Sequence, residues 1–172
     1  MREREGMITF QGNPLTLVGN PVSVGMPAPG ASLVTTDLKT TTLDDNRDKM
    51  LILAAVPSLD TSVCSEETKR FNREAEALPG DVKLVVVSMD LPFAQKRWAD
   101  ENHAANLTLL SDHKEAALGL GFGILIKELR LLARSVFVID AEGKIAYMEL
   151  VTEMTDEPDY AAAIAAAREA LE

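Results

Sequence analysis

Two largely apolar runs mark the middle of the chain. Residues 50–56 (MLILAAV) and 82–89 (VKLVVVSM) have the length of strands, as expected of central strands that are buried on both faces. Between them, residues 65–78 place apolar side chains three and four positions apart, which predicts an amphipathic helix. Pro79 and Gly80 then end this segment in a way typical of a helix stop. The pattern therefore predicts a strand, a helix and a second strand.

The same alternation continues to the C-terminal end. At the N-terminal end, residues 8–10 and 15–18 are β-type runs on either side of the turn sequence QGNP, which predicts a hairpin. Alternating strands and helices, followed by a strand pair and a closing helix, predict an α/β fold with a mixed central sheet. Beyond the central segments, we expect helices at residues 92–105, 114–122 and 157–172, and strands at residues 107–110, 134–140 and 144–151.

Length and composition favour one domain. A chain of 172 residues with 47% apolar residues can bury a core without disulfide staples. We expect a single domain over residues 1–172, in which the charged segment 1–6 is a candidate for disorder. No apolar signal-peptide region follows that segment, and no run approaches the roughly 18 apolar residues of a membrane span. We therefore expect a cytoplasmic protein that does not enter the membrane.

The charge of the chain argues against several kinds of partner. The formal net charge is −10 at pH 7, and such a surface repels nucleic acid and anionic lipid unless it carries a local basic patch. The nearest such stretch, KELRLLAR at 127–134, interleaves its charges with leucines. His103 and His113 are the two histidines, and their spacing from each other and from the single cysteine matches no zinc pattern. We expect neither a metal nor a cofactor.

The single cysteine, Cys64, lies between the first apolar run and the helix that follows it. Unpaired N–H groups and the dipole at a helix start favour an anion, and the thiolate is the nucleophilic form of cysteine. Asp60 and Thr61 are residue types that begin helices. Glu66 and Glu67 disfavour a thiolate, so a nearby cation would be needed. On position alone, the alternative that Cys64 is only a small buried apolar residue stays open.

Pro57, Thr61 and Cys64 in the stretch PSLDTSVC form the pattern P-x-x-x-T-x-x-C, which resembles the active-site motif of peroxiredoxins. The resemblance covers residues 7–171. It implies a thioredoxin-like fold, with a mixed central sheet flanked by helices, an N-terminal β-hairpin, and a homodimer. Three further stretches in the same order resemble the thiol peroxidase family, the atypical two-cysteine peroxiredoxins of bacteria: DLPFAQKRW (90–98), LLARSVFVID (131–140) and EPDYAAA (157–163).

The resemblance also implies a role for four residues. Cys64 would be the peroxidatic cysteine, whose thiolate attacks a peroxide oxygen and gives a sulfenic acid together with water or an alcohol. Thr61 would hydrogen-bond the peroxide, and Pro57 would keep bulk water from the thiolate. Arg134 would supply the cation that stabilises the thiolate and the developing negative charge. Arg130 is the other basic residue nearby, but the family places its arginine at the strand entrance, where Arg134 stands.

The chain departs from the family at the resolving position. The family follows RW or RF with a cysteine that forms an intrasubunit disulfide, whereas RWADENHAAN places Ala99 there. The glycines of the family's next stretch are absent too, which favours natural divergence over a single engineered change. Ser62 replaces a common proline without removing a chemical group. The resemblance therefore implies that an external thiol (thioredoxin, glutaredoxin or a small thiol) reduces Cys64, and a disulfide between two subunits is the weaker alternative.

Three functions compete at this point. The first is a one-cysteine peroxidase that reduces hydrogen peroxide and organic hydroperoxides. The second is a peroxide sensor or relay that passes oxidation from Cys64 to a partner protein. The third, a non-catalytic binding module, is disfavoured because such a module has no need of Pro57, Thr61, Cys64 and Arg134 together. A disulfide oxidoreductase of the thioredoxin type would require C-x-x-C, which the sequence lacks.

Overall fold

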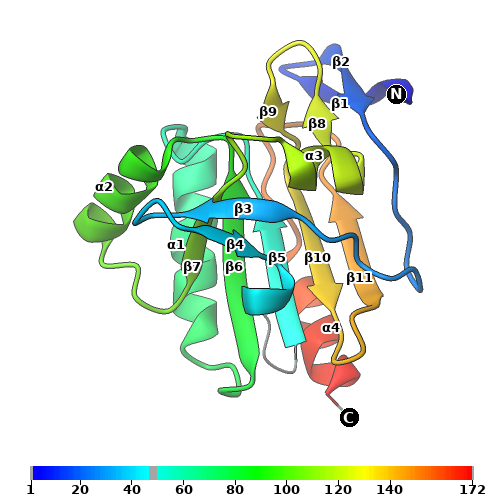
Figure 1. Cartoon of the computed structure of the whole chain (residues 1–172). Helices are drawn as coiled ribbons and strands as arrows, with labels where there is room; N and C mark the ends of the chain where they lie inside the picture. The colour runs from blue at the N-terminus through cyan, green and yellow to red at the C-terminus, as the bar shows by residue number, and fades with distance from the viewer. Residues whose placement is uncertain (1, 47–49, 172) are drawn as a thin grey trace.

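The computed structural model describes residues 2–46 and 50–171, and a seven-stranded sheet forms its centre (Figure 1). In spatial order the strands are β11 (Ile145–Leu150), β10 (Ser135–Ile139), β5 (Met50–Ala55), β6 (Val82–Ser88), β7 (Thr108–Ser111), β3 (Ser32–Thr35) and β4 (Thr40–Thr42). The pairs β5–β6 and β6–β7 are parallel, whereas β10 runs antiparallel to β5. The sheet is therefore mixed, as the sequence predicts.

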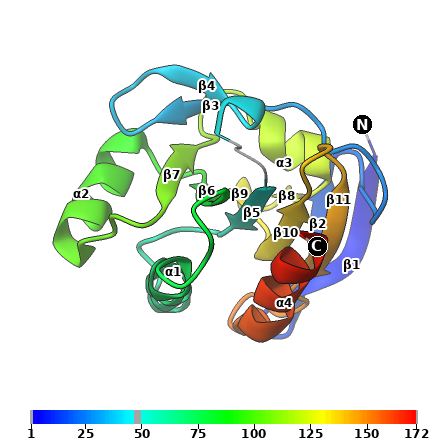
Figure 2. The same cartoon turned by 90° about the horizontal axis from the view of Figure 1, so that it is seen from below.

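Helices cover both faces of this sheet, as the view along the strands shows (Figure 2). Two helices, α1 and α4, lie on one face, α3 lies on the opposite face, and α2 packs beside β7. The helices are α1 (Ser62–Ala75), α2 (Pro92–Asn102), α3 (Ala117–Phe122) and α4 (Tyr160–Ala170), and a short 3₁₀ helix, η1 (Asp44–Asn46), follows β4. This layering gives the flanked sheet that the sequence predicts.

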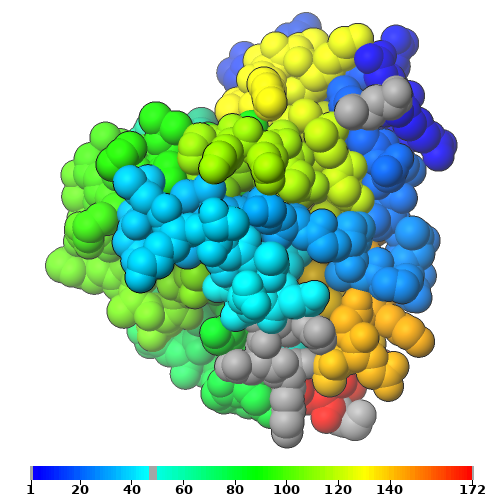
Figure 3. All heavy atoms as spheres, viewed as in Figure 1, coloured from blue at the N-terminus to red at the C-terminus, as the bar shows by residue number. Residues whose placement is uncertain are grey.

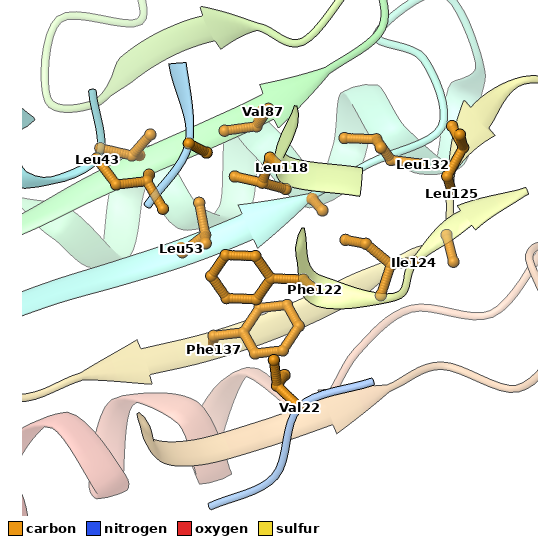
Figure 4. Close-up of a cluster of buried hydrophobic side chains, with 14 of the residues drawn as sticks. Val22, Leu43, Leu53, Val87, Leu118, Phe122, Ile124, Leu125, Leu132 and Phe137 are labelled. Atoms are coloured by element: carbon orange, nitrogen blue, oxygen red, sulfur yellow. The ribbon is translucent and has the colours of Figure 1, made fainter. Parts of the chain in front are cut away.

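The sheet divides the apolar core into two clusters. Successive side chains of β5 enter opposite clusters, because a strand points them to alternate faces. On the α3 face, the rings of Phe122 and Phe137 meet edge to face with centroids 4.9 Å apart (Figure 4). On the other face, Phe71 of α1 meets Tyr160 of α4 in the same way at 5.1 Å, and Cys64 belongs to this cluster. Every residue of β5 is fully buried, which confirms the expected strand with two buried faces.

A second sheet of four strands carries the N-terminal hairpin. Its strands are β1 (Glu3–Phe10), β2 (Asn13–Val18), β8 (Leu125–Ile126) and β9 (Leu131–Leu132), in that spatial order. The predicted hairpin is confirmed, but β1 starts well before the expected residue 8. It includes most of the segment 1–6 that was a candidate for disorder, and residue 1 itself lies outside the described residues. The first part of this strand is rich in charged residues and therefore shows no β-type pattern in the sequence. One of these residues, Glu3, pairs through its carboxylate with Lys127 at 2.7 Å.

Helix boundaries depend on local capping that the apolar pattern does not contain. The first helix begins at Ser62 rather than at residue 65, so Cys64 lies inside its first turn. The second ends at Asn102 because His103 takes a left-handed backbone conformation with φ of 51°. The last begins at Tyr160, since the Asp159 side chain accepts the Ala162 N–H. Residue 172, the end of the expected helix 157–172, lies outside the described residues.

The hairpin of β3 and β4 forms one edge of the seven-stranded sheet and crosses the front of the molecule, where its atoms lie at the surface (Figure 3). Among residues 2–46 and 50–171, no helix is long and apolar enough to cross a membrane. The same residues contain no group of three or more His, Cys, Asp or Glu side chains placed to hold a metal ion.

Candidate active site

Cys64 lies where the central strand β5 passes through a short loop into α1. The parallel order β5–α1–β6 brings the start of this helix to the carboxyl ends of the strands, where α/β proteins commonly place their sites (Figure 1). Thr61 caps the helix, and its Oγ1 accepts the Cys64 N–H at 3.3 Å. The Cys64 side chain is 0% exposed. The helix start therefore holds a shielded thiol in its first turn, at the positive end of the helix dipole.

Arg134 reaches this thiol from the strand entrance of β10, 70 residues away along the chain. Its Nη2 lies 3.2 Å from Cys64 Sγ, and the residue is only 2% exposed. The same Nη2 and the Nε donate to the carbonyl of Met154 at 2.8 and 3.2 Å, which fixes the plane of the guanidinium. A buried cation therefore lies within hydrogen-bond distance of the sulfur. Arg130, the other basic residue considered above, is exposed.

Glu67 completes this buried group. Its Oε2 accepts from Arg134 Nη1, its side chain is 0% exposed, and no hydrogen-bond partner is found for its Oε1 within the described residues. Burial raises the pKa of Glu67 to about 7, although the charge of Arg134 opposes this change. Burial alone would lower the pKa of Arg134, but Glu67 and Cys64 together raise it above its ordinary value. One guanidinium thus lies between two buried acids.

From its position in the sequence, Glu67 is expected only to disfavour a thiolate. In the structure the Glu67 carboxyl group is paired with Arg134, so the carboxylate interacts mainly with the guanidinium. The available signal was the spacing: Cys64 and Glu67 are three positions apart, and such residues share one face of a helix. Asp90, whose carboxylate contacts the loop between β5 and α1, is a second residue that no sequence motif distinguishes.

Thr61 and Pro57 lie in that loop. The Thr61 hydroxyl donates to the Ser58 carbonyl at 3.0 Å while its oxygen accepts the Cys64 N–H, and the residue is exposed. Pro57 is buried directly after the strand. Its ring has no hydrogen-bonding group, so it can act on the thiol only by packing and by excluding water. The structure brings Cys64, Thr61 and Arg134 into one hydrogen-bonded group, and it places Pro57 at the base of the same loop.

Helix α2 carries the position at which the family has its resolving cysteine. Ala99 is half-buried and packs against the cluster that contains Cys64. Its neighbour Trp98 is 5% exposed and donates its indole N–H to Ser65 Oγ at 3.0 Å. One position earlier, Arg97 pairs with Asp60 at 3.1 Å. The helix is therefore attached at two points to the segment around the thiol.

Comparison with known proteins gives a consistent result. The Redoxin family model matches residues 23–164. The thiol peroxidase of Halalkalibacterium halodurans is 49% identical over 164 residues, which cover 95% of this chain and 98% of the relative. The thiol peroxidase of Bacillus subtilis is 49% identical over 161 residues, covering 94% of this chain and 96% of the relative.

Solved structures agree with these relatives. A peroxiredoxin-like protein from Aquifex aeolicus is 42% identical, with a TM-score of 0.89 over 95% of this chain and 96% of that chain. A thiol peroxidase from Chromobacterium violaceum, at 20% identity, shares the fold with a TM-score of 0.84 over 94% and 95% of the two chains. These matches confirm the thioredoxin-like peroxiredoxin fold.

The fold and the family match together define a redox protein of the peroxiredoxin class. The chain belongs to the Redoxin family and, among its members, to the thiol peroxidases. Its activity is accordingly that of a peroxiredoxin-type peroxidase, and the resemblance stated from the motifs is confirmed.

Proposed function

We propose that the chain reduces hydrogen peroxide and organic hydroperoxides through a sulfenic acid on Cys64, and that an external thiol regenerates the cysteine. The observation that carries this proposal is the 3.2 Å contact between Arg134 Nη2 and Cys64 Sγ, two buried groups at a helix start. A thiolate in such a place is stabilised by the guanidinium and by the helix dipole. It is also shielded from general oxidants by its burial.

The first step is a displacement at oxygen. The thiolate of Cys64 attacks the terminal peroxide oxygen, an S–O bond forms, and the O–O bond breaks. The leaving hydroxide or alkoxide takes a proton from water and departs as water or an alcohol. Arg134 stabilises the negative charge as it moves from sulfur to the leaving oxygen. The Thr61 hydroxyl donates its hydrogen bond to the Ser58 carbonyl. The Thr61 oxygen can therefore accept a hydrogen bond from the peroxide.

The second step needs a thiol from outside the chain, because the sequence holds one cysteine. A first external thiol condenses with the sulfenic acid to a mixed disulfide and releases water. A second thiol then cleaves that disulfide and returns Cys64 to its reduced form. Thioredoxin, a glutaredoxin with a small thiol, or a small thiol alone could supply these equivalents. Burial of the sulfur argues against a direct disulfide between the Cys64 residues of two subunits.

A peroxide sensor or relay is the second candidate function. It is favoured by the same single cysteine, since a sulfenic acid without an internal partner stays available to a thiol of another protein. The two functions differ in turnover. A peroxidase consumes many equivalents of peroxide with a small thiol or thioredoxin, whereas a relay stops at a mixed disulfide with one specific protein.

The test is to mix reduced protein with one equivalent of hydrogen peroxide and to follow its intact mass, with Cys64→Ser as the control. We expect a rapid gain of one oxygen atom that dithiothreitol reverses, and no gain in Cys64→Ser. Sustained peroxide consumption with dithiothreitol as reductant then supports the peroxidase. An unchanged mass over several minutes would contradict both candidate functions.

A homodimer and a cytoplasmic location belong to the proposal as well. Both are supported by the resemblance of the chain to the thiol peroxidases of bacteria. Sedimentation equilibrium at several protein concentrations tests the first, because it returns either the mass of one chain, 18.6 kDa, or twice that value. Fractionation of cells that express the chain tests the second.

A further inference from the structure

Asp90 lies at the end of β6 and holds the loop that leads into the candidate active site. Its Oδ1 accepts the Ser58 hydroxyl at 2.7 Å, and its Oδ2 accepts the Leu59 N–H at 2.8 Å. The Ser88 hydroxyl donates to the same Oδ2, also at 2.8 Å. One carboxylate therefore joins the end of β6 to the two residues that follow Pro57.

Ser58 is in turn hydrogen-bonded to Thr61. The Ser58 carbonyl accepts both the Thr61 N–H, at 3.1 Å, and the Thr61 hydroxyl, at 3.0 Å. Its hydroxyl oxygen also accepts the Asp60 N–H at 3.1 Å. The position of Ser58 thus determines where the proton of the Thr61 hydroxyl points, and hence where the lone pairs of that oxygen point. One lone pair receives the Cys64 N–H, and the other is free to face a substrate.

Hydrogen bonds from residues of the sheet and of α2 hold Asp90 in place. Gln95 is 0% exposed and donates from Nε2 to Ser88 Oγ at 3.0 Å and to the Leu110 carbonyl at 2.8 Å. Because Ser88 Oγ receives this bond, its own proton is directed to Asp90. The Ser111 hydroxyl donates to the Asp90 carbonyl. Packed strands and a buried amide therefore make Asp90 a rigid support rather than a mobile surface carboxylate.

We propose that Asp90 is a positioning residue that acts through Ser58 to aim the hydroxyl oxygen of Thr61 at the bound peroxide. It contacts neither the sulfur nor the peroxide. The inference rests on the proposed reaction of Cys64 with peroxide and adds to it a residue that determines the rate. A displacement of about 1 Å in such a supporting group can lower a rate by about 100-fold, because the reacting atoms no longer meet in line.

The central experiment compares the second-order rate constant for sulfenic acid formation in the wild type, Asp90→Ala and Asp90→Asn across a range of pH. Asp90→Ala removes all three acceptor bonds, and we expect its rate to fall about 10- to 100-fold at every pH. Asp90→Asn keeps an oxygen for Leu59 and Ser88 and offers an N–H₂ to Ser58 Oγ. We expect it to recover most of the lost rate. Both variants remove the same charge, so equal rates in the two would overturn a positional role.

Alkylation by iodoacetamide separates positioning from structural damage. This reagent needs the thiolate but not the Thr61 hydroxyl, so we expect Asp90→Ala to change its rate less than about twofold. A loop that merely loosens would expose the thiol and speed alkylation, which would contradict the proposal. Asp60→Ala is the matched control, since its exposed carboxylate lies in the same loop but bonds to Arg97 instead of Ser58. We expect its rate with peroxide to stay at the wild-type value.

A double-mutant cycle with Thr61→Val tests whether Asp90 acts through Thr61. If it does, Asp90→Ala slows the reaction little further in a chain that already lacks the hydroxyl, whereas independent effects would multiply and overturn the inference. Should Asp90→Ala fail to fold, Ser58→Ala takes its place, with an expected loss of a few-fold because it removes the hydrogen bond to Asp90 and the one from the Asp60 N–H. A wild type that does not react with peroxide would contradict the proposed function and this inference together. A wild type that reacts no faster than Asp90→Ala would contradict this inference alone.

Discussion

At the residue scale, the site is a guanidinium shared by two acids. Arg134 donates through Nη2 to Cys64 Sγ and through Nη1 to Glu67, and the three residues are almost completely buried. In such a place, two negative charges beside one cation are costly, because burial strips water from each of them. The thiolate and the carboxylate therefore compete for the same positive charge. We therefore expect Glu67 to affect the free energy of unfolding and Arg134 to affect the rate of the reaction with peroxide.

Glu67 should make the protein less stable as the pH rises from about 4.5 to about 7. Its pKa is about 7 in the folded state against an ordinary 4.5, so the folded chain holds a proton in this window that the unfolded chain has lost. Its stabilising contribution is complete below about pH 4.5 and is lost by about pH 7, a change of about 3 kcal/mol. Urea unfolding of the wild type and of Glu67→Gln at pH 5 and pH 8 measures this change in the free energy of unfolding. Parallel losses of stability in the two proteins would contradict this origin.

Arg134→Lys should slow the reaction with peroxide by about 100-fold, a typical effect of removing a donor that stabilises transition-state charge. Lysine keeps the charge, but its single ammonium cannot reproduce the fork that reaches Cys64, Glu67 and the Met154 carbonyl at once. Stopped-flow measurement of the second-order rate constant gives the result. Arg130→Lys is the control, because Arg130 is exposed. A larger effect at Arg130 would mean that the wrong arginine has been assigned.

At the element scale, local motifs were predictable from the sequence, while contacts between distant segments were not. The apolar runs located β5, β6 and α1, and the motif located Thr61 and Cys64. The strands β8 and β9 have two residues each, which is too short for a hydrophobic period to appear. The pairing of Glu67 depends on Arg134, which lies just before β10 and far away in the sequence. The family resemblance placed Arg134 at the site. Composition alone could not have done so, because the loop and the strand meet only after folding.

Helix α2 has two contacts that hold it folded beside the thiol. Trp98 donates to Ser65 and Arg97 pairs with Asp60, so the helix lies against the first turn of α1 and the loop before it. The resemblance to the thiol peroxidases implies that their resolving cysteine stands at the position of Ala99. We expect a cysteine placed there to react when this helix opens, because the backbone of a helix holds its side chains in fixed directions.

Ala99→Cys should form an intrachain disulfide with Cys64 after one equivalent of peroxide, and the rate should be limited by opening of α2. Adding Trp98→Phe removes the indole bond to Ser65 and should speed the disulfide several-fold, since one hydrogen bond contributes about 1 kcal/mol. Intact mass under non-reducing conditions follows the loss of two hydrogens. Asp100→Cys, one position further on an exposed part of the helix, is the matched control. Equal disulfide yields at both positions would show that α2 does not guide the pairing.

At the scale of the whole molecule, the redox chemistry is set by what the single chain contains. In the proposed reaction, one cysteine among 172 residues means that each oxidation of Cys64 must wait for a thiol to arrive from solution. The chain holds no second cysteine that could trap the product. A sulfenic acid that waits is exposed to a second peroxide molecule, which takes it to the sulfinic acid.

The wild type should therefore over-oxidise faster than its own Ala99→Cys variant. Under a tenfold excess of hydrogen peroxide without a reductant, we expect the wild type to gain a second oxygen atom on Cys64, while the variant diverts its sulfenic acid into the disulfide. Mass spectrometry of the peptide that contains Cys64 distinguishes the two products. An external thiol present from the start should protect the wild type in proportion to its concentration, because it competes with peroxide for the same sulfenic acid. If Cys64 in the wild type escaped a second oxygen atom for as long as Cys64 in the variant, the buried site itself would have to exclude the second peroxide. Burial of the sulfur, and not a resolving cysteine, would then be the protection that this chain relies on.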